Sequence, residues 1–123
     1  MPQDEFPAGL PPRVVWQLTD GGTEFHERFV RSVQNLVVDL EPDGAQVEVV
    51  AHGAGLDLLL PGRGTAQPVR DLKHRGVTFA ACQNTLRSRL LTVEDLIPEV
   101  QAVTSVVGHV VRRQQQGWSY LRA

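Results

Sequence analysis

The stretch Val77–Leu86 reads Val-Thr-Phe-Ala-Ala-Cys-Gln-Asn-Thr-Leu and decides the predicted fold. Its first half, from Val77 to Ala81, is short and apolar, which is typical of a buried strand. Asn84 or Thr85 then suits the cap of a following helix. The single cysteine, Cys82, therefore lies where a strand ends and a helix begins, and open α/β sheets bind ligands at that edge.

Apolar strands and capped helices alternate along the rest of the chain. The pattern predicts strands at 13–18, 46–51, 77–82, 100–103 and 118–121, and helices at 23–40, 56–60, 68–75, 86–91 and 106–116. This order indicates a single α/β domain over residues 13–123, with a five-stranded, mostly parallel sheet covered on both faces. Residues 1–12 hold four of the eight prolines, so we expect an irregular arm there.

Composition narrows the class of protein. The chain has 123 residues, 41% of them hydrophobic, and a formal net charge of −2. This charge provides no overall basic field for nucleic acid or an anionic membrane, and no apolar run approaches the roughly 18 residues of a membrane span. No signal peptide is expected, because the N-terminus lacks a basic region followed by an apolar segment. We expect a cytoplasmic protein whose lone thiol stays reduced.

Polar residues follow four of the predicted strands. They are Asp20, His52, Cys82 with Asn84 close behind, and Ser105. Because parallel strands end at the same edge of a sheet, these residues are predicted to lie near one another. This convergence is the main functional signal of the sequence, although loops at such an edge are commonly polar in any case.

Cys82 has two interpretations. It is either a small buried apolar residue or a thiol activated by the amides of the following helix. A helix terminus contributes about 0.3–1 kcal/mol, and one pKa unit corresponds to about 1.4 kcal/mol. The helix dipole alone therefore lowers a thiol pKa by less than about one unit, which suits a sulfur carrier better than a dedicated catalytic nucleophile.

His52 is the candidate base beside Cys82, or else an ordinary surface histidine. No motif marks an oxyanion hole or a third orienting group, so the sequence does not support a hydrolase. Gly53 and Gly55 precede a predicted helix and are candidates to hold an anion through their N–H groups. With one cysteine, the chain has neither an intramolecular disulfide nor a cysteine-cluster metal site, and no motif requires a cofactor.

Three further features have plain structural interpretations. Glu48 alternates with two valines, which predicts that its strand is partly exposed on one face. The basic stretch 109–113, with His109, Arg112 and Arg113, is predicted to be a solvated face or a subunit contact. Core or interface packing is expected for the aromatic pair Trp118 and Tyr120.

Three motifs resemble the DsrE/DsrF-like family, and most closely its short, single-domain, mostly uncharacterised branch. They are Ala-Cys-Gln-Asn-Thr-Leu at 81–86, Val-Ala-His-Gly at 50–53 and Arg-Arg-Gln-Gln-Gln-Gly-Trp-Ser-Tyr at 112–120. The resemblance implies a flavodoxin-like, three-layer α/β fold assembled as a trimer or hexamer. It also implies that Cys82 corresponds to the cysteine that carries a persulfide in the sulfur-relay members of the family.

The leading functional hypothesis is a sulfur-relay-type protein that accepts sulfur on Cys82 and passes it between donor and acceptor proteins. In that hypothesis Asn84 and Thr85 position the sulfur and His52 assists proton movement. The alternative is an oligomeric binding module for a small anion or nucleotide-like ligand, and a third interpretation is a structural subunit without chemistry. The sequence does not decide whether the protein is an enzyme.

Overall fold

A five-stranded, all-parallel sheet forms the centre of the computed structural model, which describes residues 9–123. The predicted N-terminal arm lies mostly in residues 1–8, outside the described part. The strand order is β4-β3-β2-β1-β5, and the strands are β1 (Arg13–Leu18), β2 (Gln46–Ala51), β3 (Thr78–Cys82), β4 (Gln101–Val103) and β5 (Ser119–Arg122). The predicted five-stranded α/β fold is confirmed, and its sheet is parallel throughout.

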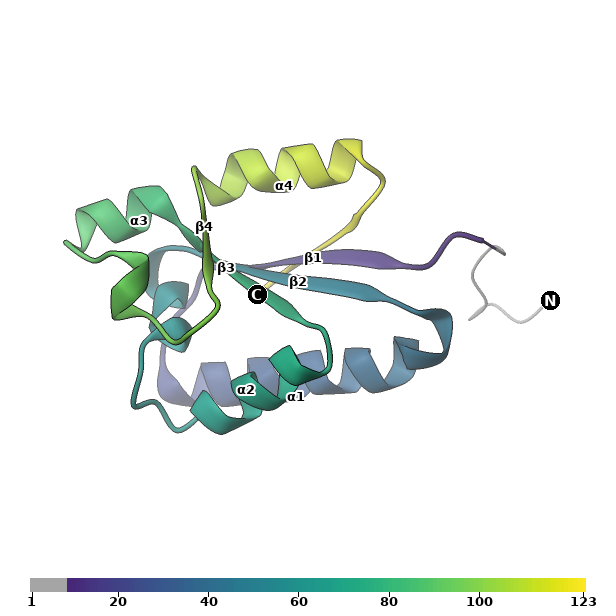
Figure 1. Cartoon of the computed structure of the whole chain (residues 1–123), viewed down its shortest axis with the longest axis horizontal. Coiled ribbons are helices and arrows are strands. Elements are labelled where there is room, and N and C mark those ends of the chain that lie inside the picture. Colours follow the sequence, from purple (N-terminus) through teal and green to yellow (C-terminus); the bar gives the residue numbers. More distant parts are fainter. Residues whose placement is uncertain (1–8) are drawn as a thin grey trace.

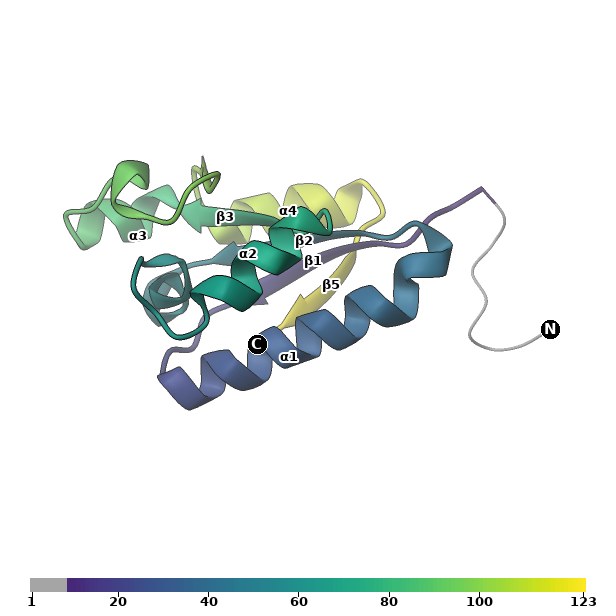
Figure 2. The ribbon, with the colours of Figure 1, turned by 60° about the horizontal axis from the view of Figure 1, so that its bottom comes forward.

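Helices cover both faces of this sheet. The helices in chain order are α1 (Thr23–Leu40), η1 (Glu41–Asp43), η2 (Gly53–Leu59), α2 (Ala66–His74), α3 (Gln83–Ser88), η3 (Val93–Asp95) and α4 (Val106–Gln115). Figures 1 and 2 show α1 and α2 on one face and α3 and α4 on the other, so the molecule has three layers. In the part of the chain that the structure describes, no helix is long and apolar enough to cross a bilayer.

The larger core lies between the sheet and the α1–α2 layer. Alternate residues of the strands point to this side, as Leu18, Val49 and Phe79 do, because successive side chains of a strand face opposite ways. Helix α1 contributes Phe29 and Val33, which are four residues apart and therefore on one face of the helix. This apolar stripe anchors the longest helix to the sheet.

The second core, under α4, is smaller. It joins Val15, Val50 and Ala80 of the sheet to Val106 and Val110 of the helix, and Cys82 belongs to the same cluster. The side chain of Ser105 caps α4 by accepting a hydrogen bond from the Gly108 N–H at 3.1 Å. A thin apolar layer of this kind places the sulfur between a strand end and the start of α4.

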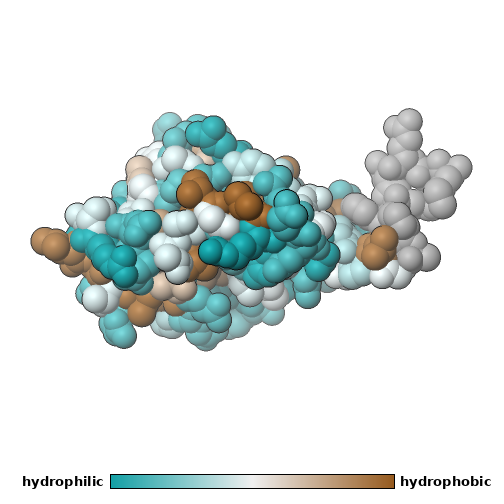
Figure 3. All heavy atoms as spheres, turned by 90° about the horizontal axis from the view of Figure 1, so that it is seen from above, coloured by the Kyte–Doolittle hydropathy of each residue, from teal (hydrophilic) through white to brown (hydrophobic). Residues whose placement is uncertain are grey.

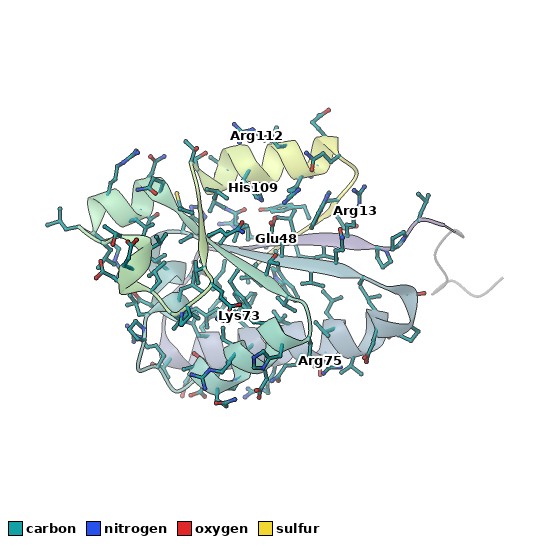
Figure 4. The ribbon with its side chains drawn as sticks, viewed as in Figure 1. Arg13, Glu48, Lys73, Arg75, His109 and Arg112 are labelled. Atoms are coloured by element: carbon teal, nitrogen blue, oxygen red, sulfur yellow. The ribbon has the colours of Figure 1, made fainter. Side chains whose placement is uncertain are left out.

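The prediction that Glu48 lies on an exposed strand face is wrong, since Glu48 is 8% exposed. Helix α4 covers this carboxylate and supplies His109, whose Nε2 lies 2.6 Å from Oε1, and Arg113, whose Nη2 lies 3.1 Å from Oε2. Figure 4 shows Glu48 and His109 facing each other between the sheet and α4, with Arg112 on the outer side of the helix. Arg113 therefore compensates a buried carboxylate that His109 also contacts, whereas Arg112 is exposed.

Candidate functional site

The strand order creates one topological switch point at the carboxyl edge of the sheet. The segment after β2 leads through η2 to α2 on one face, whereas the segment after β3 leads into α3 on the opposite face (Figures 1 and 2). In open α/β sheets, ligands bind where neighbouring strands send their connections to opposite sides. His52 directly follows β2 and Cys82 ends β3, so the two residues flank this point.

Cys82 is both the last residue of β3 and the N-cap of α3. Cys82 is 4% exposed and packs against the start of α4, while Asn84 in the first turn of α3 is exposed. The Cys82 side chain forms no cap hydrogen bond to α3. The sulfur thus lies beneath the surface rather than on it.

Groups from α3 and α4 change the ionisation of this thiol. Burial raises the pKa of Cys82, but the Thr85 N–H, the Val106 N–H, the Thr85 hydroxyl and the Asn84 N–H together lower that pKa below its ordinary value. Val106 is the first residue of α4, so the N-terminal ends of two helices favour the thiolate. The arrangement supports a thiol that ionises more readily than a free cysteine.

Thr85 joins the two segments at the switch point. Its Oγ1 accepts a hydrogen bond from the Gly53 N–H at 3.0 Å, across 32 residues of sequence. The same hydroxyl also favours the Cys82 thiolate. The sequence identified Thr85 as a candidate, but this bond between the two connections depends on the pairing of β2 with β3.

His52 is held by polar side chains of β1 and of the residue that follows it. Its Nε2 lies 2.8 Å from Gln17 Nε2 and 3.1 Å from Thr19 Oγ1. Burial, and then the positive charge of Arg122, lower the pKa of His52, which favours the neutral imidazole. Sequence reasoning missed Gln17 and Arg122. For Gln17, the available signal was a glutamine placed between Trp and Leu at the end of an apolar run.

Gly53 and Gly55, which follow β2, have structural roles within the fold. The N–H of Gly53 is bound to Thr85, and the N–H of Gly55 lies 3.0 Å from the carbonyl oxygens of both Thr19 and His52. A Cβ on Gly55 would come within 2.2 Å of the Leu18 carbonyl oxygen, so close packing of η2 on β1 requires glycine there. Packing explains these residues, and the predicted anion cradle stays a prediction.

Asp20 and Ser105 follow β1 and β4 at the same edge. The Asp20 carbonyl oxygen accepts a hydrogen bond from His26 Nε2 at 2.8 Å, and Ser105 caps α4 beside the Val106 N–H that faces the sulfur. A hollow of about 300 Å³ is lined in part by His26, and its lining includes neither Cys82 nor His52. Residues 9–123 contain no group of three or more His, Cys, Asp or Glu side chains able to hold a metal.

The fold and the site define a small three-layer α/β protein built around one thiol at a topological switch point. The chain belongs to the DsrE/DsrF-like family, whose model matches residues 28–123. No curated protein matches the chain.

Several solved structures are similar to this chain. The protein of unknown function MTH1491 from Methanobacterium thermoautotrophicum is 38% identical, with a TM-score of 0.84 over 91% of this chain and 99% of that one. The ychN protein from E. coli is 14% identical, with a TM-score of 0.71 over 93% of this chain and 100% of that one. BT1422, a conserved protein of unknown function from Bacteroides thetaiotaomicron, is 11% identical, with a TM-score of 0.70 over 90% of this chain and 94% of that one. The last two similarities concern the fold alone.

Proposed function

We propose that this protein is a sulfur carrier that holds a persulfide on Cys82 and passes the outer sulfur to a partner protein. One observation carries the proposal: the thiol lies at the switch point, where donors from α3 and α4 lower its pKa in spite of its burial. Membership of the DsrE/DsrF-like family agrees with this chemistry. A reducing cytoplasm is the proposed compartment, because a lone thiol stays reduced there.

Both steps of such a relay use the thiolate. In loading, the Cys82 thiolate attacks the outer sulfur of a donor persulfide, forming a new S–S bond while the old one breaks and the donor leaves as a thiolate. In transfer, an acceptor thiolate attacks the outer sulfur on Cys82, and the Cys82 thiolate is the leaving group. A lowered pKa increases the thiolate fraction for the first step and improves the leaving group for the second.

The burial of Cys82 sets a condition on this chemistry. At 4% exposure the sulfur is reached only when the groups that cover it move apart, so small sulfur compounds have an advantage over bulky ones. We therefore expect methyl methanethiosulfonate to modify the native thiol much faster than a bulky aromatic disulfide does. In denatured protein this difference between the reagents should shrink.

Mass spectrometry tests the proposal directly. Native protein incubated with inorganic polysulfide should gain the mass of one sulfur atom, released again by a reductant, and Cys82→Ser should gain none. Thr85→Ser keeps the hydroxyl and should load like the natural protein, whereas Thr85→Val removes it and should load more slowly. If sulfur is added only after denaturation, the carrier proposal is wrong.

We propose in addition that the chain assembles as a homo-oligomer, a trimer or a hexamer. The outer face of α4 exposes Val107 at 61% and Val111 at 57%, one helical turn apart, and the edge strand β5 exposes Tyr120 and Leu121 at 37% each. Figure 3, which looks onto the α4 side, shows a hydrophobic group surrounded by hydrophilic surface. An apolar patch with a polar border is typical of a protein contact.

Light scattering at micromolar concentration tests the assembly. The expected mass is a multiple of that of one chain, and Val107→Asp should reduce it because a desolvated carboxylate opposes association. Arg112→Asp is the matched control, because Arg112 is an exposed residue of the same helix. It should leave the mass unchanged, since the proposed contact is apolar. A natural protein with the mass of a single chain would contradict the proposed oligomer.

The burial of Cys82 favours a second candidate function, a binding module in which the cysteine is only part of a wall. In that case Cys82→Ser and the natural protein would bind a small anion or nucleotide-like ligand equally well, and neither would form a persulfide. Calorimetry with inorganic phosphate and with a nucleotide separates this candidate from the carrier.

A further inference from the structure

A line of polar side chains crosses the sheet on the face covered by α4. Tyr120 of β5 hydrogen-bonds through its hydroxyl to Gln17 Oε1 on β1, and Gln17 Nε2 lies 2.8 Å from His52 Nε2 after β2. Gln17 is buried, with 9% exposure, and its neighbours in register are Val50 and Arg122. A buried amide of this kind needs a partner at each end, and here it has both.

The chemistry of the amide gives this line a direction. An amide oxygen only accepts hydrogen bonds, so the Tyr120 hydroxyl is the donor to Gln17. The other end of Gln17 is an NH₂ group, which only donates, so His52 Nε2 must offer its lone pair. The Thr19 hydroxyl, 3.1 Å from the same nitrogen, can donate to it as well.

We propose that Tyr120, acting through Gln17, fixes His52 in the tautomer that carries its proton on Nδ1. Tyr120 and Gln17 are then positioning residues for a histidine that presents a hydrogen-bond donor, not a base, at the switch point. The positive charge of Arg122 and the burial of the ring both disfavour the imidazolium form. If the proposed sulfur chemistry holds, an N–H donor suits the anionic thiolate or persulfide better than a lone pair does.

The same molecule contains a reference histidine of the opposite tautomer. His26 Nε2 lies 2.8 Å from the Asp20 carbonyl oxygen, which only accepts, so His26 must carry its proton on Nε2. The chain has four histidines. Their ring signals in a ¹⁵N-labelled sample can be assigned by replacing one histidine at a time.

Long-range ¹H–¹⁵N correlation spectra of native, sulfur-free protein near neutral pH test the proposal. We expect His52 to show a protonated Nδ1 and an unprotonated Nε2, and His26 the reverse pattern. Gln17→Glu keeps the shape but replaces the donor by a carboxylate, so the proton of His52 should move to Nε2. Tyr120→Phe removes the donor that orients the Gln17 amide. Part of the His52 population should then carry its proton on Nε2 instead of Nδ1.

Two outcomes would overturn the proposal. One is a natural protein in which His52 carries its proton on Nε2, which would mean that the Gln17 amide is turned the other way. The other is an unchanged His52 pattern in both Gln17→Glu and Tyr120→Phe, each checked for folding by circular dichroism. Because these spectra are recorded without sulfur, a failure of sulfur loading at Cys82 leaves the tautomer result intact.

Discussion

Neutralising the buried carboxylate under α4 should cost far more stability than neutralising an exposed carboxylate with the same contact distance. Glu48 Oε2 lies 3.1 Å from Arg113 Nη2, and its side chain is 10% exposed. Glu41 Oε2 lies 3.1 Å from Arg75 Nη2, but the Glu41 side chain is 66% exposed. The two pairs share residue types and distance and differ in burial.

The expected magnitudes follow from this difference. Removing one partner of a fully buried pair costs about 3–5 kcal/mol, because the remaining charge is left without compensation. The side chains of His109 and Arg113 are 16% and 29% exposed, so water relieves part of this penalty. We therefore expect Glu48→Gln to lower the free energy of unfolding by about 2–4 kcal/mol, and Glu41→Gln by about 0.5 kcal/mol or less.

Urea denaturation at one protein concentration, near neutral pH, measures both values. Keeping the concentration fixed matters, because association would add to the apparent stability. A double-mutant cycle with Arg113→Met should give a coupling energy above about 1 kcal/mol for Glu48. Equal losses for Glu48→Gln and Glu41→Gln would refute the reasoning, because burial would then have no effect on the value of the pair.

Three other predictions concern the carboxyl edge. Thr85→Val should raise the pKa of the Cys82 thiol, because it removes a hydroxyl that favours the thiolate; a titration of thiolate absorbance measures the change. Because the pKa of His52 is lowered in the folded protein, its imidazole takes up a proton at higher pH in the unfolded chain than in the folded one. The free energy of unfolding should therefore fall as the pH drops below about 6.5, and it should depend less on pH in His52→Asn. An identical pH dependence in the two proteins would contradict this. Gly55→Ala should cost about 3 kcal/mol, because its Cβ meets the backbone of β1, while Gly64→Ala, with nothing within 4 Å, should be nearly neutral in the same unfolding assay.

The local sequence carried enough information to predict the architecture. Apolar runs bounded by turn residues mark β1 and β2 at the bounds seen in the structure, and the spacing of apolar residues marks α1 over its whole length. A local capping motif also forms at Thr92, whose N–H is bound to Asp95 Oδ2 at 2.9 Å. These features depend on residues close in the chain, so a single sequence reveals them.

The sequence was also sufficient to predict that Cys82 and His52 lie at the same edge of the sheet. A cysteine that ends one strand and a histidine that follows another must share an edge once the strands are parallel, and Cys82 and His52 do flank the switch point. The partners of these residues were not predictable. The Gln17 side chain meets Tyr120 across 103 residues, and Thr85 meets Gly53 across 32, because strand order and register bring them together.

The sequence by itself therefore determined the element types, the parallel α/β architecture and the position of the thiol, since each follows from periodicity and turn chemistry within a few residues. Only the tertiary structure decided that Glu48 is buried and paired with His109 and Arg113, and that Cys82 is covered, with 4% exposure. Whether a strand residue is buried depends on the layer that packs onto it. His109 of α4, which contacts Glu48, is 61 residues away in the sequence. The physical reason is that a strand's alternation shows which side chains share a face, but not what covers that face.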